Sequence, residues 1–324
     1  MPARVALIHN PRSRRNVRDD GRFVAEARKA LGSLFVCPAS HDALRPAVAE
    51  LARQDVRVIA VNGGDGTVSD VISAVLEFYP ADHLPALSVF PSGNTNLIAN
   101  DVGCTLRGMP ALSALSHRAR TGTLLDDVSW RQPVVASWPD PDRLPVAGMF
   151  CGLAAFTRAI ELAHNPAILE RYSHDAAIFA TLLWGLRLFL RKETRHSWMG
   201  GSRMTVTVDN DPPDSHARFL FLCTGLHQLS RGVWPFWLDD APRGGLIYLD
   251  ITGNPPGLAR GLLSVLRGRI SGRLRVSKAY RSGMAASIRI ETQDQLVMDG
   301  EELDPGPEGV LYLKEGPRMA FIRC

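Results

Sequence analysis

A glycine-rich segment, Gly63-Gly64-Asp65-Gly66-Thr67, has the clearest chemical meaning in the sequence. The β-branched residues Val58, Ile59 and Val61 before it are typical of a buried strand, and apolar residues at helical spacing follow it. We therefore expect a strand, a tight turn and a helix capped by Thr67. Glycines let the backbone approach a ligand closely, and the N–H groups at the start of a helix attract anions. The segment therefore predicts a phosphate-binding loop.

Asp65 is unusual in such a loop, because a bare carboxylate repels phosphate. Two arrangements remove the repulsion: a divalent cation lies between carboxylate and phosphate, or the carboxylate anchors the loop through hydrogen bonds. Both arrangements indicate a site for a metal-nucleotide complex. The alternative is an ordinary tight turn, which a Gly-Asp-Gly triplet alone would favour.

Two more polar loops follow predicted strands. The segment 9–15, His-Asn-Pro-Arg-Ser-Arg-Arg, comes after the strand Val5–Ile8, and its arginines suit a triphosphate. For any single arginine, a solvated basic loop is an equally good interpretation. The segment 91–96, Pro-Ser-Gly-Asn-Thr-Asn, comes after the strand Ala86–Phe90, with Asn94 or Thr95 as the cap of a following helix. With helices expected at about 16–31 and 41–53 and a short strand at 34–37, the alternation predicts a parallel, doubly wound α/β sheet. Such sheets bind ligands at the carboxyl ends of their strands, where all three loops lie.

Composition sets the general class of protein. The chain has 324 residues, of which 45% are hydrophobic, and a net charge of +4, which allows anionic partners without demanding nucleic acid. Five cysteines without paired spacing favour a reducing compartment. We see neither a signal peptide nor a long uncharged span, so we expect a cytoplasmic protein.

A change in pattern near residue 126 predicts two domains. Residues 1–125 form the α/β domain, and alternating segments within 126–309 indicate a strand-rich domain. The strands within 310–324 are expected to return to the first domain.

Four motifs carry a family resemblance: Asn10-Pro11-x-Ser13; Gly63 to Thr67; Pro91-x-Gly93-x-x-Asn96 followed by Ala99 and Gly103; and Asp299-Gly300-Glu301. In this order and spacing they resemble the soluble lipid kinases, which include bacterial diacylglycerol kinases and the sphingosine and ceramide kinases. These share their nucleotide-binding fold with NAD kinases and 6-phosphofructokinases. The resemblance implies an α/β nucleotide domain and a β-sandwich over the lipid site, with the catalytic cleft between the two domains.

The resemblance also implies a reaction: an ATP- and Mg²⁺-dependent kinase that phosphorylates a hydroxyl of diacylglycerol, ceramide or a sphingoid base. Asp65 would lie near the magnesium, Asp299 would be the general base, and Glu301 would lie beside it. The nucleotide would be held by Asn10, Gly63, Gly64, Asp65, Gly66, Thr67, Gly93, Asn94 and Asn96. We therefore expect Asp65→Asn and Asp299→Asn each to abolish transfer and leave the fold intact. Without the upstream motifs, Asp299-Gly300-Glu301 would be a plain hairpin turn between the segments 295–298 and 310–313.

Several positions depart from the family pattern. Asn94 stands where the family usually has threonine, Leu97 where an acidic residue is common, and Cys151 where asparagine is frequent. Gly244 stands where the family has an aspartate at a metal site, which is either lost here or replaced by Asp239 or Asp240. Gly244 and Asn94 support an alternative, a non-catalytic lipid-binding regulator.

Two segments bear on membranes. The segment Ala176–Leu190 is apolar on nearly all sides and too short to span a bilayer, so it is either an interfacial helix, a wall of an acyl-chain pocket or a helix buried between domains. Seven basic residues follow later and could dock on anionic headgroups or form a solvated face: Arg260, Arg267, Arg269, Arg273, Arg275, Lys278 and Arg281. We expect a lipid substrate and peripheral membrane contact.

Two further alternatives are a NAD kinase, which shares the glycine turn, and a nucleic-acid binder, for which the sequence has no recognisable module. The expected partners exclude nucleic acid, and the oligomeric state stays open, a homodimer included.

Overall fold

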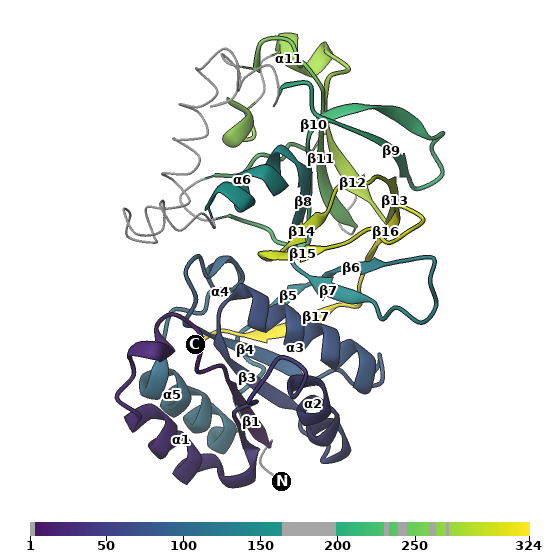
Figure 1. Ribbon diagram of the computed structural model, residues 1–324. Helices are drawn as coiled ribbons and strands as arrows, with labels where there is room; N and C mark the ends of the chain where they lie inside the picture. The colour runs from purple at the N-terminus through teal and green to yellow at the C-terminus, as the bar shows by residue number, and fades with distance from the viewer. Residues whose placement is uncertain (1–3, 164–198, 230–232, 239–244, 259–263, 270–271) are drawn as a thin grey trace. The chain divides into compact units, whose positions relative to one another are not determined.

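The computed structural model describes residues 4–163, 199–229, 233–238, 245–258, 264–269 and 272–324. The chain forms two compact units, each with its own sheet (Figure 1). Unit 1 comprises Met1–Pro133 and Pro317–Cys324, and unit 2 comprises Val134–Gly316.

Unit 1 is built on a six-stranded sheet with the order β2-β1-β3-β4-β17-β5. Its strands are β1 (Val5–His9), β2 (Phe35–Val36), β3 (Val58–Gly63), β4 (Ala86–Pro91), β5 (Val128–Arg131) and β17 (Met319–Ile322). All neighbours are parallel except β17 and β5, which are antiparallel. The predicted parallel α/β sheet is confirmed, and it brings the carboxyl ends of β1, β3 and β4 to one edge.

Helices cover this sheet on both faces: α1 (Arg22–Leu31), α2 (Leu44–Arg53), α3 (Asp65–Phe78), α4 (Leu97–Val102) and α5 (Gly108–Thr121). Apolar residues of α1 and α5 form a buried cluster with Leu7, Ala60 and Phe90 of the sheet. Residues between these along the strands, such as Ile8 and Ile59, are also buried, because side chains of a strand alternate between its faces. The helix expected at 16–31 begins only at Arg22, since Gly21 before it has a left-handed φ of 85°.

The unit boundaries differ from the predicted 125/126 and 309/310. β5 lies beyond residue 125, yet it pairs with β17 and so belongs to unit 1. β16 (Val310–Glu315), expected to return to the first domain, pairs with β13 and β6 and so belongs to unit 2. Of these two strands, only β17 returns to unit 1. The unit boundary follows the pairing of the strands and not the change in sequence pattern near residue 126.

Unit 2 contains one continuous antiparallel sheet, whose main path runs β15-β14-β8-β10-β9-β13-β16-β6-β7. Its described strands are β6 (Val134–Ser137), β7 (Val146–Gly148), β8 (Phe150–Ala154), β9 (Ser202–Val208), β10 (Asp214–Thr224), β11 (Leu246–Thr252), β12 (Tyr280–Ala285), β13 (Ser287–Glu291), β14 (Leu296–Met298), β15 (Glu301–Leu303) and β16. The described helices are α6 (Ala155–Ala163) and α11 (Gly272–Val276). The predicted strand-rich character is confirmed.

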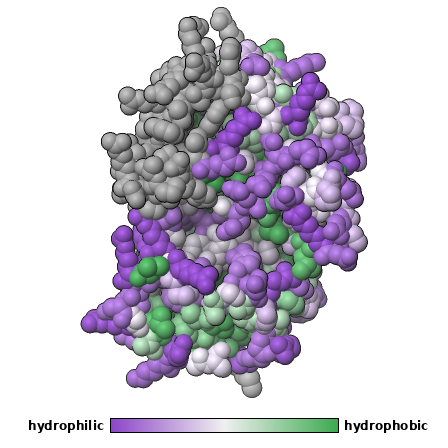
Figure 2. Space-filling view, viewed as in Figure 1, coloured by the Kyte–Doolittle hydropathy of each residue, from purple (hydrophilic) through white to green (hydrophobic). Residues whose placement is uncertain are grey.

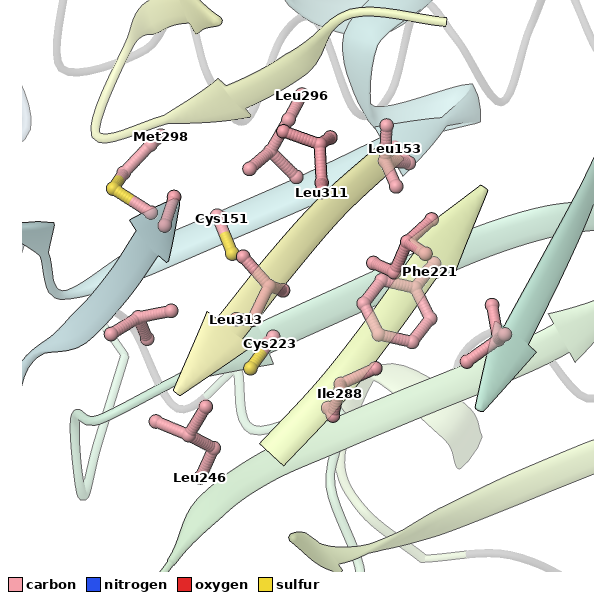
Figure 3. Close-up of a cluster of buried hydrophobic side chains, with 14 of the residues drawn as sticks. Cys151, Leu153, Phe221, Cys223, Leu246, Ile288, Leu296, Met298, Leu311 and Leu313 are labelled. Atoms are coloured by element: carbon pink, nitrogen blue, oxygen red, sulfur yellow. The ribbon is translucent and has the colours of Figure 1, made fainter. Parts of the chain in front are cut away.

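The long strand β10 organises this sheet. Residues 220–224 pair with β8, residues 214–218 pair with β9, and β11 pairs along the other edge. Inward-facing side chains from β8, β10, β13, β14 and β16 form one apolar core (Figure 3). Cys151 and Cys223 are register partners within this core, and both are free thiols.

The described surface is mostly hydrophilic on the face shown in Figure 2, with hydrophobic residues in small groups. Among the described residues, no helix is both long enough and apolar enough to cross a membrane. The predicted apolar segment Ala176–Leu190 lies outside the described residues, as do Asp239, Asp240 and Gly244.

Candidate active site

The glycine loops after β3 and β4 are in direct backbone contact. A Cβ atom on Gly93 would lie 2.5 Å from Gly64 Cα, and Ser92 N–H donates to the carbonyl of Gly63 at 3.0 Å. Gly63 has no room for a side chain either, because a Cβ atom there would lie 2.6 Å from Thr67 Cβ. The packing of the two loops against each other therefore requires glycine at these positions, whether or not a ligand also approaches them.

Helix α3 begins at Asp65, with Gly64 as its N-cap, so Thr67 is not the cap that the sequence suggested. The first intrahelical bond is donated by Val68 N–H to the carbonyl of Gly64. The N–H groups of residues 65–67 have no acceptor within the helix, and the positive end of the helix dipole lies with them. An anion at this point would meet both loops and the start of a helix of 14 residues.

Asp65 anchors one loop to the other. Its carboxylate is buried and accepts hydrogen bonds from Thr95 Oγ1 at 2.7 Å and from the N–H groups of Leu97 and Ile98, each at 3.0 Å. Burial raises the pKa of Asp65, and these hydrogen bonds oppose that rise. Because both oxygens are already occupied by donors, the geometry favours the anchoring interpretation over direct metal coordination.

Asp65 also serves as the missing cap of α4. Neither Asn94 nor Thr95 is the N-cap; Asn96 is, with a left-handed φ of 50° and no side-chain bond to the helix. The Asn96 side chain instead bonds the backbone of Gly93, accepting from its N–H at 2.8 Å and donating to its carbonyl at 3.0 Å. Asp65 satisfies the free N–H groups of α4 from a distant part of the chain.

The loop after β1 joins the same assembly through Asn10. Its side-chain amide donates to Thr67 Oγ1 at 2.7 Å, and its backbone N–H donates to the carbonyl of Asn62 at 3.0 Å. Further along this loop, Arg15 N–H donates to the carbonyl of Ser92 at 3.1 Å. The three polar loops predicted from the sequence are therefore bonded to one another at one sheet edge.

A small cavity of about 110 Å³ opens beside the Asn10–Thr67 bond, with His9, Arg12, Ser40 and Asp70 among its lining residues. His9 is buried, and its Nδ1 lies 3.1 Å from Asn62 Nδ2. Burial lowers the pKa of His9, which keeps the imidazole neutral and able to accept at Nδ1. Asn62 in turn accepts from Ser92 Oγ at 2.5 Å, so a buried polar chain supports the floor of the site.

Asp299 lies in unit 2, at the turn of a two-residue hairpin between β14 and β15. Asp299 and Gly300 have φ values of 47° and 97°, and Asp-Gly is the sequence preferred where both turn residues need positive φ. The hairpin partner of β14 is β15, and not the segment 310–313 of the plain-turn alternative. Glu301 is exposed at the start of β15.

The carboxylate of Asp299 is held by the backbone between β7 and β8. It accepts from Met149 N–H at 2.6 Å and from Phe150 N–H at 3.1 Å. Gly148 makes this approach possible, because a Cβ atom there would lie 2.5 Å from Asp299 Oδ2. Asp299 is only partly buried, and Gly300, the next residue of the turn, is exposed.

Among the described residues, Asp214, His216 and Asp250 place ligand atoms within 4.8 Å of one another, as in a metal site. The fully buried Arg218 donates to both oxygens of Asp250, at 2.9 and 3.1 Å, and Arg281 bonds Asp214 at 2.6 Å. Two guanidinium groups thus neutralise these carboxylates, and we assign the group to an internal ion network.

The structure collects the predicted nucleotide residues Asn10, Gly63 to Thr67, Gly93 and Asn96 in one assembly, with Asn94 exposed on the same loop. Sequence reasoning missed Asn62, Ser92 and Gly148. Asn62 and Ser92 are polar residues at the ends of apolar strands, a signal that was available. Gly148 gave no signal, because its role depends on Asp299 far along the chain.

The polar loops of unit 1 thus form a candidate phosphate site at one edge of an α/β domain, and known proteins resemble the chain in this region. Residues 4–125 match the model of the diacylglycerol kinase catalytic domain. No curated protein is significantly similar in sequence. The residues of the polar loops after β1, β3 and β4 all fall within the matched range.

Solved structures extend the likeness to the whole chain. Two structures of a candidate diacylglycerol kinase from Bacillus anthracis strain Sterne have TM-scores of 0.63 and 0.62 and identities of 16% and 15%. They cover 98% and 99% of this chain and 96% and 97% of their own. A third, a diacylglycerol kinase of the same strain, has a TM-score of 0.57, 15% identity and coverage of 98% and 96%.

Residues 4–125 of unit 1 are therefore similar to diacylglycerol kinase catalytic domains. This confirms the resemblance to lipid kinases and the predicted enzyme class, a phosphotransferase that uses an alcohol as acceptor. At these identities the solved structures show the fold: an α/β domain followed by a β-rich domain.

Proposed function

We propose that the protein transfers the terminal phosphate of ATP to a hydroxyl group of a lipid, either diacylglycerol, ceramide or a sphingoid base. The observation that carries the proposal is the contact between Gly64 and Gly93. It places two glycine loops and the start of α3 at a single point, in the part of the chain that matches the kinase family.

The phosphates of ATP would lie against the N-terminus of α3, where free N–H groups and the helix dipole compensate negative charge. Asn10 holds Thr67 in place there, and the exposed Asn94 supplies an amide where the family usually has a hydroxyl. Magnesium is proposed as the counter-ion of the ATP phosphates, whose charge it neutralises, and not as an ion bound by Asp65.

Asp299 is proposed as the general base. Its carboxylate accepts the proton of the lipid hydroxyl while the hydroxyl oxygen bonds to the terminal phosphorus and ADP leaves. The N–H groups of Met149 and Phe150 fix the orientation of the carboxylate. The side chain therefore loses its conformational entropy before the substrate binds and not during the reaction.

The test is transfer from terminally labelled ATP, with magnesium, to detergent-dispersed diacylglycerol, ceramide and sphingoid bases, with NAD as a separate soluble acceptor. We expect label in one lipid class and its loss in Asp299→Asn. Label in NAD would establish a NAD kinase. Label in no acceptor, from folded protein that binds the lipids, would establish the non-catalytic regulator.

A further inference from the structure

The net positive charge of the chain comes from one segment. Residues 251–290 contain eight arginines and lysines and no aspartate or glutamate. The whole chain has 37 basic and 33 acidic residues, so the rest has 29 basic and 33 acidic residues and a net charge of −4. The positive charge of the protein is therefore a local property of this segment.

Several of these side chains are exposed. Arg267 and Arg269 follow a short helical stretch, and Lys278 follows α11. In the described parts of the chain, none of the three has an acidic partner within salt-bridge distance. Arg281 and Arg289 differ, because they pair with Asp214 and Glu291. Arg260 and the side chains of Arg273 and Arg275 lie outside the described structure.

An apolar segment lies directly beside the basic one. Trp234 N–H donates to the carbonyl of Leu266 at 2.8 Å, and a Cβ atom on Gly268 would lie 2.7 Å from the carbonyl oxygen of Trp234. The segment 233–238, Val-Trp-Pro-Phe-Trp-Leu, continues along β12, where Trp237 N–H donates to Ser282 Oγ at 3.1 Å. Leu238 at its end is 40% exposed.

Helix α11 adds a second exposed apolar side chain. Val276, its last residue, is 85% exposed, although a β-branched aliphatic side chain gains nothing from water. Figure 1 shows α11 at one end of unit 2. We define the basic face as Arg267, Arg269 and Lys278 together with Leu238 and Val276.

We propose that the basic face docks unit 2 on an anionic lipid bilayer. Exposed cations bind the headgroups, and the aliphatic side chains of Leu238 and Val276 enter the interfacial layer. The proposal rests on the proposed function in one respect, because a bilayer is where a lipid substrate is found. Nucleic acid fits less well, since it offers no apolar layer to an exposed valine and leucine.

The size of the effect follows from the number of charges. One basic residue near an anionic membrane surface strengthens binding about five-fold, so removal of three weakens it on the order of 100-fold. The test variant is Arg267→Gln, Arg269→Gln and Lys278→Gln together. The control variant, Lys29→Gln, Arg53→Gln and Arg120→Gln together, removes the same charge from exposed positions of unit 1.

Binding is measured by co-sedimentation of the full chain with vesicles of phosphatidylcholine, alone or mixed with phosphatidylglycerol. We expect binding to the mixed vesicles only, about 100-fold weaker binding in the test variant and no change beyond about two-fold in the control. Leu238→Ser with Val276→Ser should weaken binding at high salt, where charge is screened. Equal losses in both triple variants, unchanged binding in the test variant, or tighter binding to duplex DNA than to vesicles through the same residues would overturn the proposal.

A second measurement separates this proposal from the kinase proposal. Phosphate transfer is followed with a short-chain diacylglycerol dissolved as monomer and with a long-chain one in vesicles. If only docking is lost, the test variant retains wild-type rates on the soluble substrate and loses them on vesicles. If the wild-type protein transfers no phosphate to either substrate but binds vesicles through the basic face, the kinase proposal fails and the docking proposal stands.

Discussion

Replacement of Asp65 by asparagine tests whether this residue anchors the loops. The carboxylate accepts three hydrogen bonds, from one hydroxyl and two backbone N–H groups. An asparagine keeps one acceptor oxygen and turns an NH₂ group toward groups that are themselves donors. Each lost bond to a charged acceptor costs about 1.5–3 kcal/mol, and a buried donor left unsatisfied costs about 1–3 kcal/mol.

Part of this cost is recovered, because burial of the charge was itself unfavourable, as the raised pKa of Asp65 indicates. We therefore expect a net loss of roughly 3 kcal/mol in the local stability of α4. At about 1.4 kcal/mol for each factor of ten, that loss raises the population of the opened α4 helix roughly 100-fold, and hydrogen exchange of its amides becomes faster by the same factor.

Hydrogen exchange of the Leu97 and Ile98 amides measures this directly, with a urea unfolding curve to follow unit 1 as a whole. The matched control is Asp126→Asn, which makes the same chemical change at an exposed position of unit 1. Exchange at Leu97 and Ile98 that matches the wild-type protein would refute the anchoring role. A loss of ATP turnover with wild-type exchange would instead favour a metal-binding Asp65.

Three further predictions address the glycine contact, the base and the buried histidine. Gly93→Ala should abolish ATP binding in calorimetry, because its Cβ would lie 2.5 Å from Gly64 Cα and force the loops apart; wild-type affinity would contradict this. Asp299→Asn should lower kcat by about 10²–10⁴ with ATP affinity unchanged, and a near-normal kcat would exclude a general base. Because burial lowers the pKa of His9 from 6.5, the unfolded chain binds the proton more readily, so stability to urea should fall as the pH drops below 6.5. His9→Gln should reduce that fall, and an identical pH profile would show that His9 is not its source.

The order of elements and the parallel sheet were predictable, because 58–61 and 86–90 are short, nearly continuous apolar runs typical of buried strands and the segment between them has apolar residues at helical spacing. That three polar loops meet at one edge then followed from the geometry of parallel sheets. The helix caps were not predictable, since local rules consider only neighbours. Thr67 and Asn94 looked like caps, but Gly64 and Asn96 occupy those positions, and α4 is satisfied by Asp65 from more than 30 residues away.

The return of the chain to unit 1 was misplaced for a related reason. Both 310–315 and 319–322 are plausible strands, and the pattern of side chains does not distinguish which sheet each one joins. The sheet that each strand joins depends on its pairing partners. β16 pairs with β13 and β6, whereas β17 pairs with β4 and β5. The requirement for glycine at position 148 was unpredictable for the same reason, because it comes from the packing of Asp299, a residue distant in sequence, against this position.

The two aspartates show why a motif alone does not assign a role. Asp65 and Asp299 each use a carboxylate to accept two consecutive backbone N–H groups, so their local hydrogen bonding is nearly the same. Their surroundings differ: Asp65 is buried and receives a third bond from Thr95, whereas Asp299 lies at an exposed turn. A proton acceptor must reach its substrate, and an anchor need not. The same substitution by asparagine should therefore act on stability at Asp65 and on the rate of transfer at Asp299, which replaces the sequence-based expectation that both would act on transfer alone.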